Sequence, residues 1–177
     1  TAVARILVAA VSSRRCTVTA LAVHGVMTGA GDPIHRFRLN NFDMVVPDGQ
    51  PVRWALNALY HLQLPDRVYG PKLTLEVCAE AARQGLPVFF YGSRQEVVRQ
   101  LAARLSERFP GLRVAGYRPS LFRNMSAGER GELVEEITAS GARILFVGLG
   151  CPRQEVFTYE LGKQLSMPIL AVGAAFD

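Results

Sequence analysis

One acidic side chain, that of Asp48, directly follows an apolar run in the segment DMVVPDGQPVRW, residues 43–54. Proline, aspartate and glycine in this order are typical of a turn, because proline presets φ, aspartate bonds the local backbone and glycine accepts a positive φ. A carboxylate held on such a turn can also take a proton from a substrate. Asp48 is therefore either a turn residue or a general base, and its neighbours Gly49 and Gln50 are candidates for substrate contact.

The segment LFVGLGCPRQE, residues 145–155, has the composition of an anion-binding loop at the start of a helix. Glycines let the backbone approach a phosphate, the free N–H groups of a helix start attract anions, and an arginine suits a pyrophosphate. The candidate substrate-binding residues here are Gly148, Gly150, Pro152, Arg153, Gln154 and Glu155. Pro152 is expected at the first helical position, Gln154 at a ribose or base, and Glu155 at the helix N-terminus. A tight strand–helix turn explains the same residues, and the motif is neither a P-loop nor a complete GxGxxG.

A third loop lies in FFYGSRQE, residues 89–96, where a strand ends and a helix begins. Ser93 is expected to be the N-cap of this helix, with Glu96 completing a capping box. Tyr91, Gly92 and Ser93 are candidates for substrate contact. A purely structural role explains the loop equally well.

Several kinds of catalytic site are missing from the sequence. The aspartates include no DxD pair of the kind that holds a divalent cation on a diphosphate, so no metal is expected. The histidines (His24, His35 and His61) are isolated and are expected at the surface or in caps. No GxSxG, zinc-type or Cys-His spacing stands out. Asp48 remains the best-placed base, beside Thr19 at the end of the preceding strand.

The elements that must position these residues alternate along the chain. Strands are expected at 17–22, 43–46, 87–92, 112–117, 143–147 and 168–172. Helices are expected at 3–13, 51–62, 73–84, 95–109, 127–140 with Ser126 as its N-cap, and 153–165, with a helical or irregular stretch at 23–40. This pattern predicts the α/β class, with a Rossmann-like open, mostly parallel sheet and helices on both faces. Ligands then bind beyond the carboxyl ends of the strands, where loops 47–51, 92–94 and 148–153 meet.

The composition is that of a globular protein. The chain has 177 residues, 49% of them hydrophobic and 20% charged, which suits a single domain over residues 1–177. Its net charge of +5 is scattered, which fits an anionic ligand or a membrane surface and gives no sign of nucleic-acid binding. Three distant cysteines predict reduced thiols in the cytosol. No apolar run is long enough to span a bilayer, and both ends are expected to be truncated.

The sequence resembles the WecG/TagA/CpsF family of bacterial glycosyltransferases, glycosyltransferase family 26. The resemblance rests on VTALAVHGVM, NNFDMVVPDGQPVRWAL, RVYGPKLTLEVCAEAARQGLPVFFYGS, FPGLRVAGY, ASGARILFVGLGCPRQE and AVGAAFD. It implies an inverting, metal-independent transfer of a sugar, often of N-acetylmannosamine type, from a UDP-sugar, with no other cofactor. The acceptor would be a polyprenyl-diphosphate-linked saccharide for cell-surface polysaccharide synthesis. It also implies that Asp48 is the general base, Thr19 an active-site threonine and 148–155 the nucleotide-sugar loop.

The resemblance further implies a peripheral location on the cytoplasmic face of the plasma membrane. Family members carry an arginine-rich C-terminal extension that helps membrane docking, and its absence here would expose an apolar surface for homo-oligomer formation. The chain departs from the family at Leu21, where many members have asparagine, and at Lys72, where many have aspartate. Either change would mark a different sugar or acceptor, or a weakened enzyme.

Two other functions remain open on the sequence. A nicotinamide-dependent oxidoreductase is favoured by Gly148-x-Gly150 after a strand and by Asp177 after the next one, but the third glycine is missing. A non-catalytic subunit that binds a sugar nucleotide is favoured by the departures at Leu21 and Lys72.

Overall fold

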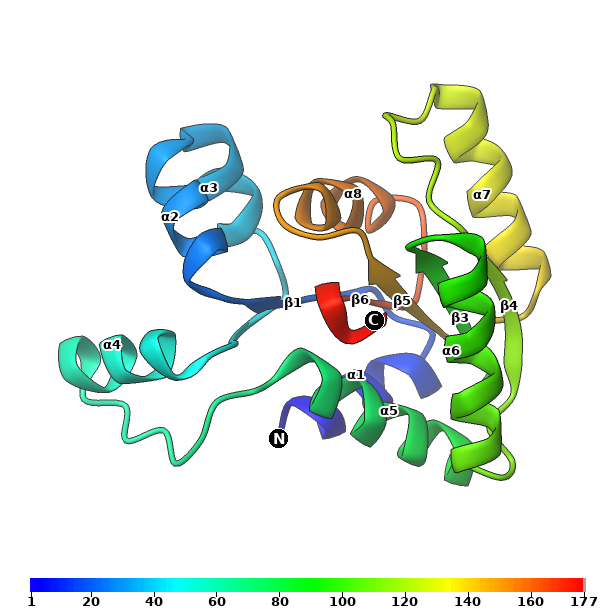
Figure 1. Ribbon diagram of the computed structural model, residues 1–177, viewed down its shortest axis with the longest axis horizontal. Coiled ribbons are helices and arrows are strands. Elements are labelled where there is room, and N and C mark those ends of the chain that lie inside the picture. Colours follow the sequence, from blue (N-terminus) through cyan, green and yellow to red (C-terminus); the bar gives the residue numbers. More distant parts are fainter. Residues whose placement is uncertain (177) are drawn as a thin grey trace.

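A parallel sheet lies between two layers of helices in the computed structural model, which describes residues 1–176 (Figure 1). Within these residues the sheet has six strands, all parallel, in the order β2-β1-β6-β5-β3-β4. The strands are β1 (Cys16–Leu21), β2 (Met44–Pro47), β3 (Val88–Gly92), β4 (Val114–Arg118), β5 (Ile144–Gly148) and β6 (Pro168–Ala171). The predicted α/β class with an open parallel sheet is confirmed. Asp177, expected just after the last strand, lies outside the described residues.

The helices follow the strands in the predicted alternation. They are α1 (Ala2–Val11), α2 (Val23–Gly31), α3 (Pro33–Asn40), α4 (Gln50–Tyr60), α5 (Gly70–Gln84), α6 (Gln95–Arg108), α7 (Ala127–Ala139) and α8 (Arg153–Leu161), and a short 3₁₀ helix, η1 (Gly173–Phe176), follows β6. Helices α1, α5 and α6 pack on one face of the sheet, and α7 and α8 pack on the other. Strands β1, β3, β5 and β6 are buried along their whole length between these layers, which explains why they carry no charged residues.

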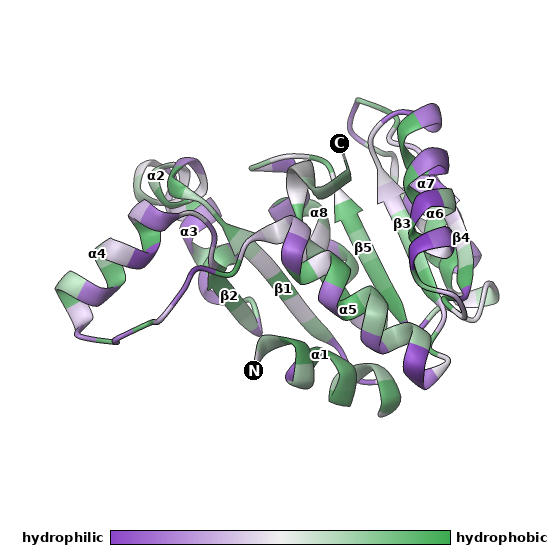
Figure 2. Cartoon of the chain, turned by 60° about the horizontal axis from the view of Figure 1, so that its bottom comes forward, coloured by the Kyte–Doolittle hydropathy of each residue, from purple (hydrophilic) through white to green (hydrophobic). Residues whose placement is uncertain are grey.

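Alternate residues of β3, β5 and β6 enter separate cores on the two faces. On the α1–α5–α6 face, Phe90 and Phe146 stack with ring centroids 5.2 Å apart. On the α7–α8 face, Phe89 and Leu145 pack with Leu133 of α7. The hydropathy colouring shows apolar strands inside and polar stripes on the outer sides of α6 and α7 (Figure 2). Thr19, whose neighbours Val18 and Ala20 join the first core, therefore points toward α8.

The stretch 23–40 forms two helices, α2 and α3, that meet at Asp32. The Asp32 carboxylate accepts hydrogen bonds from the backbone N–H groups of Ile34 (2.8 Å) and His35 (3.1 Å). These bonds cap α3 and lower the pKa of Asp32 below its usual value. The chain is thereby turned so that one face of α3 lies against α8.

One of the two predicted caps is confirmed and the other is wrong. Ser126 and Glu129 form a reciprocal capping box at the start of α7. Ser93 does not cap α6, because Arg94 occupies the N-cap position and no side chain caps that helix. Ser93 instead has a left-handed backbone, φ 52°, and its N–H donates to the carbonyl of Gly148 at 3.0 Å. The turn after β3 is therefore tied to the end of β5.

Helix α4 projects from the body of the molecule, and none of its residues is buried (Figures 1 and 2). Trp54, Leu59 and Tyr60 on this helix are 60–72% exposed, as are Ile34 and Phe37 on α3 at 60–64%. The described residues include no helix both long and apolar enough to cross a bilayer. Helices α3 and α4 thus expose several large apolar side chains.

Candidate functional site

The carboxyl ends of the parallel strands gather the predicted loops at one rim of the sheet. Asp48 directly follows β2, and its backbone N–H donates to the carbonyl of Leu21 at the end of β1. One carboxylate oxygen, Oδ2, accepts a long hydrogen bond of 3.4 Å from the N–H of Gly70, the first residue of α5. The turn and the start of α5 thus hold the half-buried carboxyl group in place while leaving it open to solvent on one side.

The environment of Asp48 favours proton binding. Burial raises the pKa of its carboxyl group above the usual 3.8 and outweighs the N–H groups of Gly70 and Gly49 and the charge of Arg67, which lower it. A raised pKa makes a carboxylate a better proton acceptor near neutral pH. The link between β2 and α4 thus positions a carboxyl group of raised pKa, and its role as a general base stays a prediction.

A second aspartate, next to the other end of β2, provides a contrast. Asp43 lies at the opposite, amino end of β2, where its Oδ2 accepts from the backbone N–H of Thr17 at 2.8 Å and from its hydroxyl at 2.9 Å. Arg15 lies 3.6 Å from its other oxygen. Asp43 therefore ties β1 to β2 and lies at the edge of the sheet away from the loops.

Thr19 lies deeper than the sequence predicts. It is paired with Val45 of β2 and Ala171 of β6, inside the sheet, and its side chain is fully buried. Its hydroxyl donates to Oε1 of Glu155 at 3.1 Å. Thr19 thus contacts the first turn of α8 rather than Asp48, and a contact with substrate stays a prediction.

The loop after β5 separates into an exposed and a buried half. Gly150, Pro152 and Arg153 are exposed, whereas Gln154 and Glu155 are only 3% and 1% exposed. Pro152 occupies the N-cap position of α8, so the prediction that it is the first helical residue is wrong by one position. The Gln154 amide donates to Oε1 of Glu155 at 2.9 Å. The buried pair supports the loop from beneath, and contact of either residue with a nucleotide stays a prediction.

Two clefts lie on either side of Arg153. The first, of about 460 Å³, is lined by Ser93, Arg94, Gly148, Gly150, Arg153 and Phe176. Two guanidinium groups and the backbone of two glycine turns at a helix start provide this cleft with the groups that bind a diphosphate. It joins the second and third predicted loops in one surface.

The second cleft, of about 390 Å³, has a more apolar wall. It is lined by Tyr91, Arg130, Pro152, Arg153 and Phe157, among others. The ring of Tyr91 stacks on that of Phe157 at 4.6 Å, and its hydroxyl donates to the sulfur of Met125. Tyr91 is only 2% exposed, so it forms part of the floor of this cleft.

Glycine is required where β3 and β5 end. A Cβ on Gly92, which has φ 135°, would lie 2.2 Å from the carbonyl oxygen of Gly148. Such a close approach and such a backbone angle are available only to glycine. This approach draws loops 92–94 and 148–153 together.

The two departures from the family pattern have different surroundings. Leu21 is buried at the end of β1, against Gly25 of α2. Lys72 is exposed on α5, 3.9 Å from Glu76 one turn later. Leu21 thus places an apolar side chain in the interior below the rim, whereas Lys72 places a cation at the surface.

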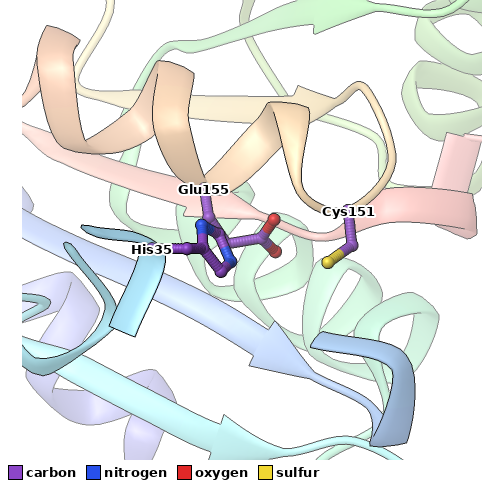
Figure 3. Close-up of side chains that lie close together, drawn as sticks. All are labelled: His35, Cys151 and Glu155. Carbon is purple, nitrogen blue, oxygen red and sulfur yellow. The ribbon is translucent and has the colours of Figure 1, made fainter. Parts of the chain in front are cut away.

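A cluster of potential metal ligands was missed by the sequence analysis. His35 of α3, Cys151 of the β5–α8 loop and Glu155 of α8 lie together, with one ligand atom of each within 4.8 Å of the others (Figure 3). The prediction that His35 is at the surface or in a cap is wrong, because it is 1% exposed; His24 and His61 are exposed as predicted. More than a hundred residues separate His35 from the other two, so no local spacing reveals the cluster.

Comparison with known proteins identifies the family. The sequence profile described as "Glycosyl transferase WecG/TagA/CpsF family" matches residues 1–177. The chain is also similar to an "N-acetylglucosaminyldiphosphoundecaprenol N-acetyl-beta-D-mannosaminyltransferase" of Bacillus spizizenii, with 28% identity over 147 residues. The match covers 82% of this chain and 55% of that protein, so the chain spans about half the length of the relative. With the profile matched from end to end, the chain belongs to the WecG/TagA/CpsF family of glycosyl transferases.

Proposed function

We propose that the protein containing this chain transfers a sugar from a UDP-sugar to a polyprenyl-diphosphate-linked saccharide, with inversion of the anomeric centre. One observation carries the proposal: the same rim of the sheet holds a cleft lined by glycines and arginines and a carboxyl group of raised pKa. A leaving diphosphate and an attacking hydroxyl need these two features. Family membership and the name of the Bacillus spizizenii relative support the same reaction.

Asp48 is the general base of the proposed reaction. Its carboxylate takes the proton of the acceptor hydroxyl while the oxygen forms a bond to the anomeric carbon. The bond from that carbon to the UDP oxygen breaks on the opposite face. Arg153, Arg94 and the N–H groups of the β5–α8 loop stabilise the negative charge on the leaving UDP. The transfer step needs no metal ion in this proposal, in line with the absence of a DxD pair.

The sheet leaves room for both substrates. Asp48 follows β2 and Gly148 ends β5, with β1 and β6 between these strands. Neighbouring strands lie about 4.8 Å apart, so the two strand ends are separated by about 14 Å. A diphosphate on the β5–α8 loop would therefore place its sugar over β6 and β1, with the acceptor hydroxyl between that sugar and Asp48.

The relative's name supports an N-acetylmannosamine-type donor and a lipid-linked acceptor. A lipid-linked acceptor requires contact with the membrane surface, and the proposed location is the cytoplasmic face of the plasma membrane. The exposed apolar residues of α3 and α4, and the net positive charge, support such peripheral contact. The same surface would also serve a homo-oligomer, and sedimentation with and without vesicles separates the two uses.

A transfer assay tests the proposal. Full-length protein is given UDP-N-acetylmannosamine and a polyprenyl-diphosphate-linked N-acetylglucosamine, and UDP release and the lipid product are measured. Sugar transfer supports the proposal, and UDP binding without any transfer supports the non-catalytic subunit instead. A parallel titration with NAD tests the oxidoreductase, which predicts tighter binding of NAD than of UDP.

A further inference from the structure

The buried cluster of His35, Cys151 and Glu155 has polar atoms that the protein itself does not satisfy. Both ring nitrogens of His35 and Oε2 of Glu155 are buried and have no hydrogen-bond partner among the described residues. A buried polar group left without a partner destabilises the folded protein. A native protein rarely leaves such atoms together, so the cluster indicates a missing partner that contacts both His35 and Glu155.

The charge of the cluster indicates what kind of partner is missing. Glu155 is 1% exposed, and no arginine, lysine or histidine of the described residues forms an ion pair with it. Its hydrogen bonds come from the neutral side chains of Thr19 and Gln154, both to Oε1. A buried carboxylate without a cation is costly. A divalent cation bound by this carboxylate and a thiolate would make the site neutral.

We propose that His35, Cys151 and Glu155 bind one zinc-class divalent cation beneath the β5–α8 loop (Figure 3). One nitrogen, one sulfur and one oxygen ligand suit Zn²⁺, whereas Mg²⁺ and Ca²⁺ prefer oxygen alone. The three ligands include neither Asp48 nor an arginine of the cleft, and the proposed role of the ion is structural.

The geometry needs only a small adjustment. Ligand atoms around a tetrahedral zinc ion are about 3.3–3.7 Å apart, because each bond is about 2.0–2.3 Å long. The three atoms already lie within 4.8 Å of one another. Side-chain rotations that move the ligand atoms by about 1 Å bring them to these separations. The Cys151 thiol gives its proton to the solvent, and a water molecule completes the set of four ligands.

The ion would connect two parts of the molecule. His35 belongs to α3, while Cys151 and Glu155 flank the start of α8. Binding through Oε2 leaves Oε1 of Glu155 free for its bond to Thr19. The ion would therefore fix the α2–α3 pair and the β5–α8 loop to each other, and would stabilise the loop that carries Arg153.

Cobalt provides the direct test, because a thiolate bound to Co²⁺ gives a charge-transfer band in the near ultraviolet. Full-length protein is stripped with a chelator, freed of any affinity tag and titrated with Co²⁺, and then with Zn²⁺ against a chromophoric chelator. We expect one ion per chain and the thiolate band. Cys151→Ser should abolish the band and weaken zinc binding by more than about 100-fold.

Two further variants separate ligand loss from misfolding. Cys78→Ser changes a fully buried thiol in the other core and should retain the band and the affinity, after a melting curve confirms that it folds. Glu155→Gln keeps the shape of the side chain and should also weaken zinc binding, while leaving the thiol intact. Zinc should raise the melting temperature of the wild type and leave that of Cys151→Ser unchanged.

Other outcomes overturn the proposal. A cobalt band that persists in Cys151→Ser, or zinc affinity that is equal in wild type and Glu155→Gln, places the ion elsewhere. Failure of the stripped wild type to bind either ion in a 1:1 ratio also overturns the proposal and leaves a buried water as the missing partner.

Discussion

Replacement of Asp48 by asparagine tests the assignment of the general base with little structural change. The amide oxygen of asparagine can still accept the 3.4 Å hydrogen bond from Gly70. The amide nitrogen cannot accept a proton at neutral pH, so the substitution removes the basic function and retains the turn. Any loss of turnover then reports the proton transfer itself.

The expected loss follows from the role of the group. A positioned general base contributes about 10²–10⁴-fold to a reaction rate, which is about 3–5.5 kcal/mol of transition-state stabilisation. Folding stability should not fall. Because burial raises the pKa of Asp48 in the folded protein, the charged form is disfavoured there, and stability from this group is lost as pH rises above 3.8. Asparagine removes this cost, so Asp48→Asn should melt at or above the wild-type temperature at pH 7.

The assay measures turnover in the full-length protein, as UDP release from the donor with a lipid-linked acceptor, beside UDP binding by calorimetry. Asp48→Asn should lose kcat and keep the affinity for UDP. Asp43→Asn is the matched control, since Asp43 flanks the same strand, β2, at its opposite end, bonded to Thr17. It should lower the melting temperature and retain most of the turnover.

The pH dependence gives an independent check. Wild-type kcat/KM should fall as pH drops through the raised pKa of Asp48, and this acidic limb should be missing from the residual activity of Asp48→Asn. Near-normal turnover in Asp48→Asn, or an unchanged acidic limb, would refute the reasoning and leave Asp48 as a turn residue.

Three further predictions concern the support of the site. Gly92→Ala should destabilise the protein by about 3 kcal/mol or more, because its Cβ would lie 2.2 Å from the Gly148 oxygen. Chemical denaturation measures this loss, and an unchanged unfolding free energy would contradict the close approach. Arg153→Ala should weaken UDP binding by about 10–100-fold, as measured by calorimetry. Its melting temperature should be unchanged, since this side chain is exposed. An unchanged affinity for UDP would show that Arg153 does not bind the diphosphate. Thr19→Val should lower the unfolding free energy by about 1–3 kcal/mol, because the buried Glu155 carboxylate loses a 3.1 Å hydrogen bond. An unchanged denaturant midpoint would show that another group replaces the Thr19 hydroxyl as the donor.

Local sequence patterns were sufficient to predict the elements of the fold. Short uncharged strands between amphipathic helices predict a parallel sheet covered on both faces, since no other arrangement buries such strands. The turn residues of PDG and the glycines after β5 predict loops at its carboxyl rim for the same reason. Ser126 is a correct cap prediction because its partner Glu129 lies within the same turn.

The errors arose where a distant segment determines the conformation of a residue. Ser93 has the sequence of a cap, yet the bond of its N–H to Gly148 on the neighbouring strand turns its backbone into the left-handed region. Pro152 is shifted by one position at the start of α8. Thr19 was expected beside Asp48 at the end of a strand, but the parallel register of the sheet places its hydroxyl against Glu155.

The sequence by itself determined the layers of this protein and the rim at which its loops meet, and it predicts Asp48 as the base. These follow from periodicity and turn chemistry, which act over a few residues. Only the tertiary structure decided the burial of Glu155, the raised pKa of Asp48 and the meeting of His35 with Cys151. Each of these depends on packing between α8 and elements more than a hundred residues away, or on the approach of α5 to β2, and desolvation is a property of that packing alone.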